Sequence, residues 1–192
     1  MSGSEPTPSP RRQELLEAAY AYALRSGLGQ LSLRPLAEAI RTSPRVLLYL
    51  FDSKDGLIRA LLARARADEL SHLQGITDPR HEPGDLRSVA HGLWRWLADG
   101  AHRGLLTLWV ESYSRSLVDP DGPWAGFARD TVRDWLELLA AGQPAEVRDT
   151  EAALAQRTLV LAVLRGALLD LLATGDVART TAAVHLQLAR LE

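Results

Sequence analysis

Apolar residues recur at spacings of three and four along almost the whole chain, and the alternation typical of β-strands is nearly absent. Spacings of three and four place side chains on one face of an α-helix. Proline and glycine fall at intervals that divide this pattern into segments, and helices are expected to end there. The sequence therefore predicts an all-α fold of about nine helices.

The predicted helices differ in length between the two parts of the chain. The expected N-terminal helices cover 11–26, 33–40, 44–50, and Asp52 or Ser53 to about 73. Ser32 and Ser43 are expected to cap two of them, because a serine hydroxyl accepts a bond from a free N–H at a helix start. After a weak linker at Gly75–Gly84, longer helices are expected at about 85–99, 104–118, 122–141, 146–174 and 177–190.

Composition is that of an ordinary globular protein, with 192 residues of which 46% are hydrophobic and 24% charged. Cysteine is absent, which excludes disulfides and thiolate chemistry. No uncharged apolar stretch reaches membrane-spanning length, and the opening MSGSEPTPSP lacks the apolar core of a signal peptide. We therefore expect a soluble, cytoplasmic protein without a membrane partner and with a disordered tail over residues 1–10.

The net charge of −2 conceals an asymmetry along the chain. Residues 1–66 hold ten basic and six acidic side chains, whereas residues 67–192 hold twelve and eighteen. A nucleic-acid-binding module joined to a domain of another kind has this pattern. Chance accounts for a modest excess of this size equally well, so charge alone leaves both interpretations open.

Two very short predicted helices, 33–40 and 44–50, are joined by only Arg41-Thr42-Ser43. Helices of this length are unstable alone and must pack on their neighbours. The side chains expected to pack between them are Leu36, Ala37, Ile40, Leu47 and Phe51. The outward face of the second helix would carry Pro44, Arg45, Leu48 and Tyr49. This spacing favours a helix-turn-helix, in which the second helix enters the DNA major groove, over an ordinary αα-hairpin of a helical bundle.

Residues 11–57 resemble the N-terminal module of the TetR family of bacterial transcriptional regulators. RRQELLEAAYAYALRSG resembles the first helix of that family, LSLRPLAEAI its capped second helix, and SPRVLLYLFDSKDGL its recognition helix with the following Phe, Lys and Leu. The register holds without a gap. The resemblance implies a helix-turn-helix DNA-binding domain over 11–57 and a helical ligand-binding and dimerisation domain over 58–192.

The resemblance also implies roles for individual residues. Ser32 and Arg34 occupy places that usually contact phosphate, and Lys54 matches a lysine that grips a phosphate at a helix N-terminus. Tyr49 lies where the family places an aromatic or histidine residue against the DNA backbone. The full predicted DNA-binding set is Arg11, Arg12, Ser32, Arg34, Thr42, Ser43, Pro44, Arg45, Val46, Tyr49 and Lys54.

Three residues depart from the family pattern. Arg41 stands where the family usually has glycine in the turn, which costs about 1 kcal/mol if the turn needs a positive φ. Arg45 stands where a small residue is common; it either pairs with guanine, contacts phosphate only, or solvates the helix. Leu48 replaces a common tyrosine, so one expected phosphate contact is lost unless Tyr49 supplies it.

The segment TLVLAVLRGALLDLLATG, within the expected helix 146–174, is apolar on nearly every side. Such a helix must be covered all round, and a second subunit is the expected cover. The resemblance implies that the last two helices pair across a two-fold axis. Within this run, Arg165 and Asp170 are either interface ion pairs or pocket residues, and the interface is the favoured reading. The predicted interface residues are Leu161, Arg165, Gly166, Leu168, Leu172, Val184 and Leu188.

All five tryptophans lie between residues 85 and 141, where the resemblance implies a ligand cavity. Large aromatic residues are usually core, and cavities are also lined by apolar and aromatic side chains. Trp94 and Trp96 are two residues apart, so at most one of them faces any pocket. The predicted lining is His91, Trp94, Trp109, Tyr113 and Trp135. The linker at 75–84 would transmit ligand binding to the fourth helix.

No motif for catalysis, metal binding or a cofactor is found, since HExxH, GxSxG and a glycine-rich phosphate loop are absent and the five histidines are scattered. We therefore expect no enzyme, no cofactor and no metal. The predicted function is a TetR-like regulator, by family habit a repressor, that binds a palindromic operator as a homodimer and is released by a small-molecule effector. The alternatives are a dimeric ligand-binding protein with an impaired DNA-binding module, and a regulator controlled by a protein partner.

Overall fold

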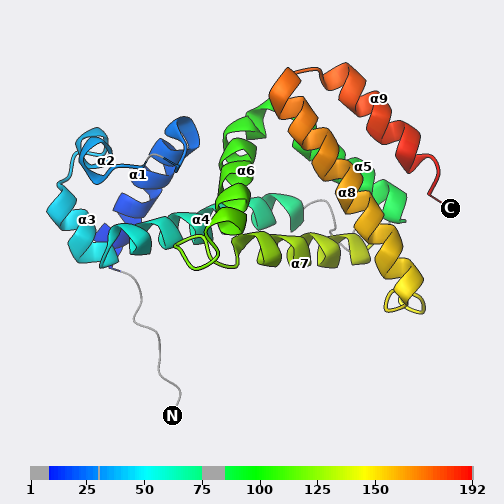
Figure 1. The fold of residues 1–192 in the computed structure, drawn as a ribbon, viewed down its shortest axis with the longest axis horizontal. Helices are drawn as coiled ribbons and strands as arrows, with labels where there is room; N and C mark the ends of the chain where they lie inside the picture. The colour runs from blue at the N-terminus through cyan, green and yellow to red at the C-terminus, as the bar shows by residue number, and fades with distance from the viewer. Residues whose placement is uncertain (1–8, 30, 75–84, 192) are drawn as a thin grey trace, which may run out of the picture.

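The computed structural model describes residues 9–29, 31–74 and 85–191, and its ordered elements are all helical. Figure 1 shows α1 to α3 at one end of the molecule and the pair α8–α9 at the other, with α4 running between them. The helices are α1 (Pro10–Ser26), α2 (Leu33–Ala39), α3 (Pro44–Phe51), α4 (Lys54–Gln74), α5 (Leu86–Ala98), α6 (Arg103–Val118), α7 (Phe127–Ala140), α8 (Glu151–Thr174) and α9 (Val177–Leu188), with a 3-10 turn at Gly100–His102.

Side-chain caps define most of the helix starts. Asp85 accepts a hydrogen bond from the backbone N–H of Ser88 at the start of α5. Thr150 begins α8 by the same type of bond, to the N–H of Ala153. These caps satisfy N–H groups that have no partner within the helix, so the local sequence fixes where each helix begins.

Several expected boundaries need correction. The first helix begins at Pro10 with Ser9 as its cap, one residue before the expected start. α7 begins at Phe127 instead of 122, because Gly126 has a φ of 77° that no α-helix contains. α8 begins at Glu151 instead of 146, after a turn closed by the Thr150 cap. The other ends agree within about two residues, as is usual for frayed helix termini.

The N-terminal helices are tied to the rest of the chain mainly through α4. The Tyr20 hydroxyl on α1 donates to Asp68 on α4 at 2.8 Å, and Arg64 pairs with Glu17 at 2.8 Å. α4 continues without a break across the predicted domain boundary at 57/58, and it packs on α1, α3 and α6. The predicted tail, apart from Ser9 and Pro10, and the predicted linker 75–84 lie outside the described residues.

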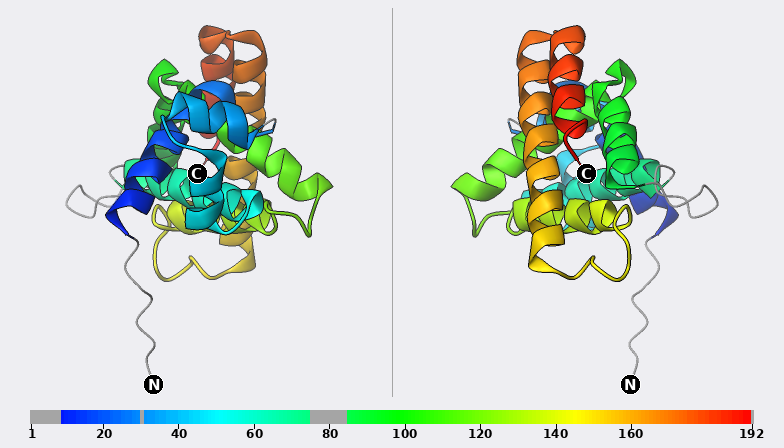
Figure 2. Two further views of the ribbon diagram at one scale, coloured as in Figure 1. Left: turned by 90° about the vertical axis from the view of Figure 1, so that its left-hand side faces the viewer. Right: turned by 90° about the vertical axis from the view of Figure 1, so that its right-hand side faces the viewer.

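One helix in the described part of the chain, α8, is long and apolar enough to cross a bilayer. Core helices of soluble proteins pass the same test, and α8 packs against α5, α6, α7 and α9. Figure 2 shows α8 and α9 side by side at the end of the molecule away from α2 and α3. An apolar helix in this position has one face in the core and one face open.

Candidate functional site

α3 is anchored by two side chains and presents the rest of its surface outward. Leu47 and Phe51 are buried in the same cluster as Leu36 and Ala37 of α2, as the sequence predicted, and Ile40 packs at its edge. Residues exposed on the opposite side are Pro44, Arg45, Val46, Leu48 and Tyr49. The Tyr49 side chain is 82% exposed, which is far more than packing within the chain explains for an aromatic residue.

The two serines predicted to cap α2 and α3 behave differently. The Ser43 hydroxyl accepts a bond from the N–H of Val46 and caps α3 as expected. The prediction was wrong for the Ser32 side chain, which makes no capping bond although the residue stands at the start of α2. The third residue of α2 is Pro35, which has no N–H to donate. The exposed Ser32 hydroxyl is therefore free of the helix it precedes.

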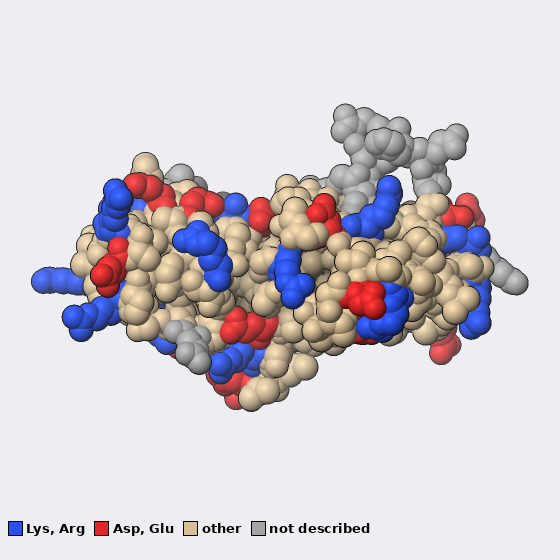
Figure 3. All heavy atoms as spheres, turned by 90° about the horizontal axis from the view of Figure 1, so that it is seen from above, with Lys and Arg blue, Asp and Glu red and all other residues tan. Residues whose placement is uncertain are grey.

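The basic residues of this module fall into two groups. Arg34, Arg45 and Lys54 are exposed on α2, α3 and the first turn of α4. Basic side chains project from this end of the molecule in Figure 3 (left). Lys54 is the first residue of α4 and directly follows the Ser53 cap. At this helix end the free N–H groups and the lysine can both bind a phosphate.

Arg12, by contrast, contacts the C-terminal end of α3. Its Nε donates to the carbonyl of Leu50 at 3.2 Å, and its guanidinium lies 4.8 Å from the centre of the Phe51 ring. These contacts hold the C-terminal end of α3 in place, and the contact of Arg12 with DNA stays a prediction. Arg11 is exposed and pairs with Glu14 one turn further along α1.

The turn between α2 and α3 has the backbone conformation that favours glycine, even though it carries Arg41. Arg41 has a φ of 55°, and the next N–H, of Thr42, donates to the carbonyl of Ala37 at 2.8 Å. The substitution for glycine therefore leaves the positive φ of the turn in place. The strain of a side chain at positive φ, about 1 kcal/mol, is retained in the fold.

A contact that the sequence did not predict joins this module to α6. Glu111 on α6 accepts a hydrogen bond from the backbone N–H of Leu28 with 2.8 Å between Oε2 and nitrogen. Arg115, one turn further on, donates to the carbonyl of Gly29. The two partners lie 83 residues apart in the chain, so no local pattern signals the pair.

The described fold resembles solved structures of regulators over nearly its whole length. A member of the TetR family from Streptomyces coelicolor A3, SCO1917, is 25% identical with a TM-score of 0.68, over 94% of this chain and 97% of that chain. The multidrug binding protein EbrR, complexed with imidazole, is 25% identical with a TM-score of 0.68, over 95% and 89%. A transcriptional regulator from Rhodococcus sp. Rha1 is 20% identical with a TM-score of 0.75, over 93% and 94%.

The chain has the fold of the TetR family, and these similarities support its assignment to that family. The neighbours support a transcriptional regulator and not an enzyme. No family model matches the sequence, and no curated protein matches it either. The assignment rests on the similarity to solved structures, together with the helix-turn-helix arrangement of α2 and α3.

The residues predicted to line one pocket lie at separate places in the structure. His91 and Trp94 line a hollow between α5 and α9, where burial and the nearby His185 ring lower the pKa of His91. Trp109 and Tyr113 line a different cavity of about 460 Å³ between α6 and α8. The two sets lie on different helix pairs, so the five residues do not form a single pocket.

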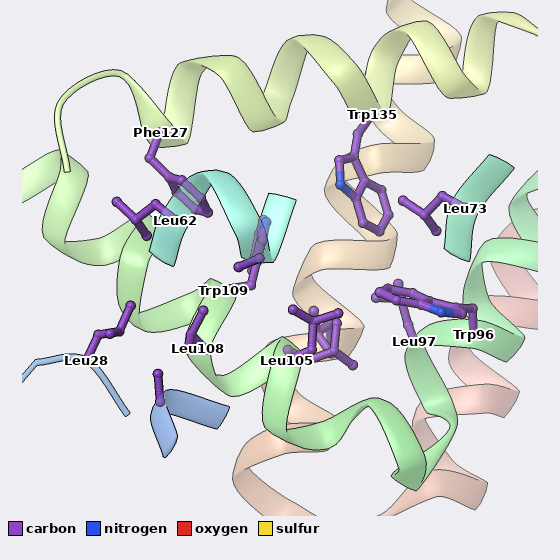
Figure 4. Packing of buried hydrophobic residues seen from close by; sticks show 14 of the residues in the cluster. Leu28, Leu62, Leu73, Trp96, Leu97, Leu105, Leu108, Trp109, Phe127 and Trp135 are labelled. Carbon is purple, nitrogen blue, oxygen red and sulfur yellow. The ribbon is translucent and has the colours of Figure 1, made fainter. Parts of the chain in front are cut away.

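Trp135, the fifth predicted residue, lies in the interior between these sites. Figure 4 shows Trp109 and Trp135 projecting into the core, with Leu62 and Phe127 on one side and Leu73 and Trp96 on the other. The Trp135 indole N–H donates to Glu69 at 2.8 Å. Burial raises the pKa of Glu69 to about 7, and the bond from Trp135 acts in the opposite direction.

Most residues predicted for the dimer interface face the wrong way. Leu161, Leu168, Val184 and Leu188 are buried within the chain itself, so they cannot contact a partner. Leu172 is half-buried. The favoured interface role of Arg165 is corrected, because its side chain turns inward against Tyr113, while Asp170 pairs with Arg179 of α9. Of the predicted set only Gly166 lies on the exposed face of α8.

The exposed face of α8 carries a row of apolar and small residues that the sequence analysis missed. This row, the α8 stripe, is Ala155, Leu159, Ala162, Gly166, Leu169 and Ala173. Its spacing of four and three is that of a helix seam facing another helix. Leu159 and Leu169 are each 51% exposed, and Leu186 on the neighbouring helix α9 is 63% exposed. The sequence carries no signal for this face, because α8 is apolar on nearly every side and only its packing decides which side stays exposed.

Proposed function

We propose that this TetR-family regulator binds a palindromic DNA operator as a homodimer, inserting α3 into the major groove. The observation that carries the proposal is the outer face of α3, where Arg45 and the 82% exposed Tyr49 have no role in the fold. A cationic side chain at the start of such a helix can read guanine, and an exposed tyrosine hydroxyl can contact phosphate.

Phosphate contacts would position the helix on the duplex. Lys54 and Arg34 flank α3 from the first turns of α4 and α2, and both are exposed. The free hydroxyl of Ser32 is a further donor on the same side. The proposal also keeps the predicted DNA contacts at the start of α3, from Thr42, Ser43, Pro44 and Val46. It keeps the predicted contact from Arg11 on α1 as well. Arg12 supports the end of α3 through Leu50 and Phe51, and its predicted contact with DNA also remains part of the proposal.

A homodimer through α8 and α9 would supply the second α3. The α8 stripe and Leu186 form an exposed apolar surface of the kind that marks protein interfaces. A two-fold pairing of this surface buries it against an identical copy. One short helix reads too few base pairs for useful specificity, and two α3 helices in one dimer double the site.

Regulation by a small molecule, with repression as the default state, completes the proposal, together with a cytoplasmic location. EbrR is a multidrug binding protein described in complexes with imidazole and with proflavin. In the present chain the cavity between α6 and α8 is large enough for a small effector. A ligand there would act on α6, which contacts the α1–α2 connection through Glu111.

Selection from a random duplex pool tests this function. Bound DNA is recovered, amplified and reselected, and the titrations are repeated with Arg45→Ala and Lys54→Ala. We expect a palindromic site whose affinity falls steeply with salt. Lys54→Ala should weaken all sequences alike, whereas Arg45→Ala should relax one base position, a loss of about 1–3 kcal/mol of discrimination. Failure to enrich any site at low salt would remove DNA binding and favour the alternative of an impaired module.

A further inference from the structure

Arg165 is a half-buried arginine that forms no ion pair with any of the described residues. Its guanidinium lies 5.3 Å from the centre of the Trp109 ring and 5.1 Å from that of Tyr113. Among the described residues, its one hydrogen bond is a long one, 3.4 Å from Nη1 to the Tyr113 hydroxyl. Contact with two aromatic faces partly compensates a buried cation, but it supplies no acceptor oxygen.

The surroundings of Arg165 have more donors than acceptors. The Nε and Nη2 atoms of Arg165 and the indole nitrogen of Trp109 are buried and have no hydrogen-bond partner in the described part of the chain. The buried carboxylate of Glu69 accepts a hydrogen bond from Trp135. Burial lowers the pKa of Arg165 and the charge of Glu69 acts in the opposite direction, but the two side chains form no ion pair. Buried donors of this kind are costly to leave unpaired, and an arginine matches a carboxylate in a bidentate arrangement.

Arg165 also lines the cavity of about 460 Å³ between α6 and α8. Trp109 and Tyr113 form an aromatic wall, with their ring centres 5.1 Å apart, and Leu117 and Leu169 add apolar surface. A flat apolar body can lie against such a wall, since aromatic rings prefer offset or tilted stacking. The cavity therefore combines apolar and aromatic surface with a cation that has no ion pair in the described part of the chain.

We propose that this cavity binds small aromatic carboxylates, with the carboxylate on the Arg165 guanidinium and the ring against Trp109 and Tyr113. This inference rests on the proposed function, in that the bound acid would be the effector of the regulator. It names the chemical class of that effector. The ligand body would lie against α6, two residues from Glu111 at Tyr113, so its binding is placed next to the contact with Leu28.

Isothermal titration of the full chain with three naphthalene probes tests the class of ligand. The probes are 2-naphthoate, its neutral isostere 2-naphthamide, and 2-naphthylmethylammonium. We expect 2-naphthoate to bind at least tenfold more tightly than 2-naphthamide, and the ammonium compound to bind more weakly than either. Equal or tighter binding of the amide or the ammonium compound, or no binding of 2-naphthoate, overturns the proposal.

The variant Arg165→Met removes the guanidinium charge and keeps an unbranched aliphatic stem. It should lose at least tenfold in affinity for 2-naphthoate while its affinity for 2-naphthamide changes less than threefold. Arg95→Met is the matched control, because Arg95 is exposed and lines the separate hollow between α5 and α9. Unchanged binding of 2-naphthoate to Arg165→Met overturns the assignment, and if that variant does not fold, the comparison of probes on the native chain still decides.

The titrations are independent of DNA. If a duplex is selected as described above but 2-naphthoate does not bind, this inference fails and the proposed function stands. If 2-naphthoate binds with the expected preference and no duplex is selected, the site stands and the proposed function fails. If 2-naphthoate releases a selected duplex from the native chain but not from Arg165→Met, the result supports both the effector site and the proposed function.

Discussion

The carboxylate of Glu111 on α6 holds the backbone N–H of Leu28 in the connection between α1 and α2, at 2.8 Å. The next turn of α6 repeats the attachment, since Arg115 donates to the carbonyl of Gly29. The same helix presents Tyr113 to the cavity beside α8. α6 is therefore in contact with both the DNA-binding module and the proposed effector site.

Replacing Glu111 by alanine should lower the free energy of unfolding by about 1–2 kcal/mol. Leu28 is only 1% exposed, and its N–H would lose its acceptor. Urea unfolding measures the change. Glu111→Gln keeps an acceptor oxygen and should recover most of the stability.

The exposed carboxylate of Glu137 on α7 provides the control for this prediction. Glu137→Ala should change the free energy of unfolding by less than about 0.5 kcal/mol. If Glu111→Ala is no less stable than Glu137→Ala, the contact with Leu28 contributes nothing to the fold.

Arg41→Gly should stabilise the protein by about 1 kcal/mol. The residue has a φ of 55°, where a side chain is strained and glycine is not. The gain is reduced by the greater freedom of glycine in the unfolded chain. Glu38→Gly, in the exposed part of α2, should instead destabilise the protein by a similar amount. Thermal unfolding measures the change in stability of both variants, which should be a gain for Arg41→Gly and a loss for Glu38→Gly. A loss of stability in Arg41→Gly contradicts the argument.

Gly166→Arg should break the proposed homodimer without harming the protomer. A Cβ added at Gly166 meets no atom within 4 Å inside the chain, so steric conflict can come only from a partner. Within a helix, arginine is favoured over glycine by about 0.5–1 kcal/mol, so the isolated protomer should be at least as stable as before. Sedimentation velocity should show a monomer, and DNA affinity should fall.

Gly100→Arg is the matched control for the dimer prediction. An added Cβ at Gly100 also meets nothing within 4 Å, but this residue lies in the turn before α6 and is not part of α8. It should leave the sedimentation coefficient unchanged. A Gly166→Arg protein that still sediments as a dimer would place the interface elsewhere.

Glu69 should make the stability of the protein fall as the pH rises. Its carboxyl has a pKa of about 7 in the folded state, above the ordinary value of 4.5, because burial disfavours the charged form. Below pH 4.5 the group is protonated in both states. Between pH 4.5 and 7 the unfolded chain loses the proton first, so the folded state loses up to about 3 kcal/mol relative to it.

Glu69→Gln removes this titration and keeps an oxygen that can accept from Trp135. The difference in unfolding free energy between Glu69→Gln and the native chain should therefore grow by up to about 3 kcal/mol from pH 4.5 to pH 8. Glu137→Gln, at an exposed position, should show no such growth. A difference that stays constant with pH for Glu69→Gln would show that Glu69 ionises as an ordinary carboxyl.

Much of the DNA-binding module could be predicted from sequence because its determinants are local. Ser43, Pro44 and the apolar spacing of Leu47 and Phe51 define α3 within eight residues, and the structure agrees. The failure at Ser32 is local too, since Pro35 removes the N–H that a capping serine would use. The bond from Arg12 to the Leu50 carbonyl was not predicted, because the two residues lie 38 positions apart.

The second half of the chain resisted prediction for a physical reason. α8 is apolar on nearly every side, so its sequence does not say which side faces the core, and residues such as Leu161 and Leu168 were assigned to the interface although they are buried. The sequence predicts which helices carry the five expected pocket residues, but it does not predict how those helices pack. The five residues were therefore assigned to one pocket, although the structure places them at separate sites.

By itself, the sequence determined the all-helical fold, the helix-turn-helix and the resemblance to TetR regulators, since caps, turns and periodicity act over a few residues. Only the tertiary structure decided that Arg165 turns inward to Trp109 and Tyr113, that Gly166 lies on an open seam, and that Glu111 holds Leu28. These relationships join residues far apart in the chain, and they are fixed by how amphipathic and fully apolar helices share one core.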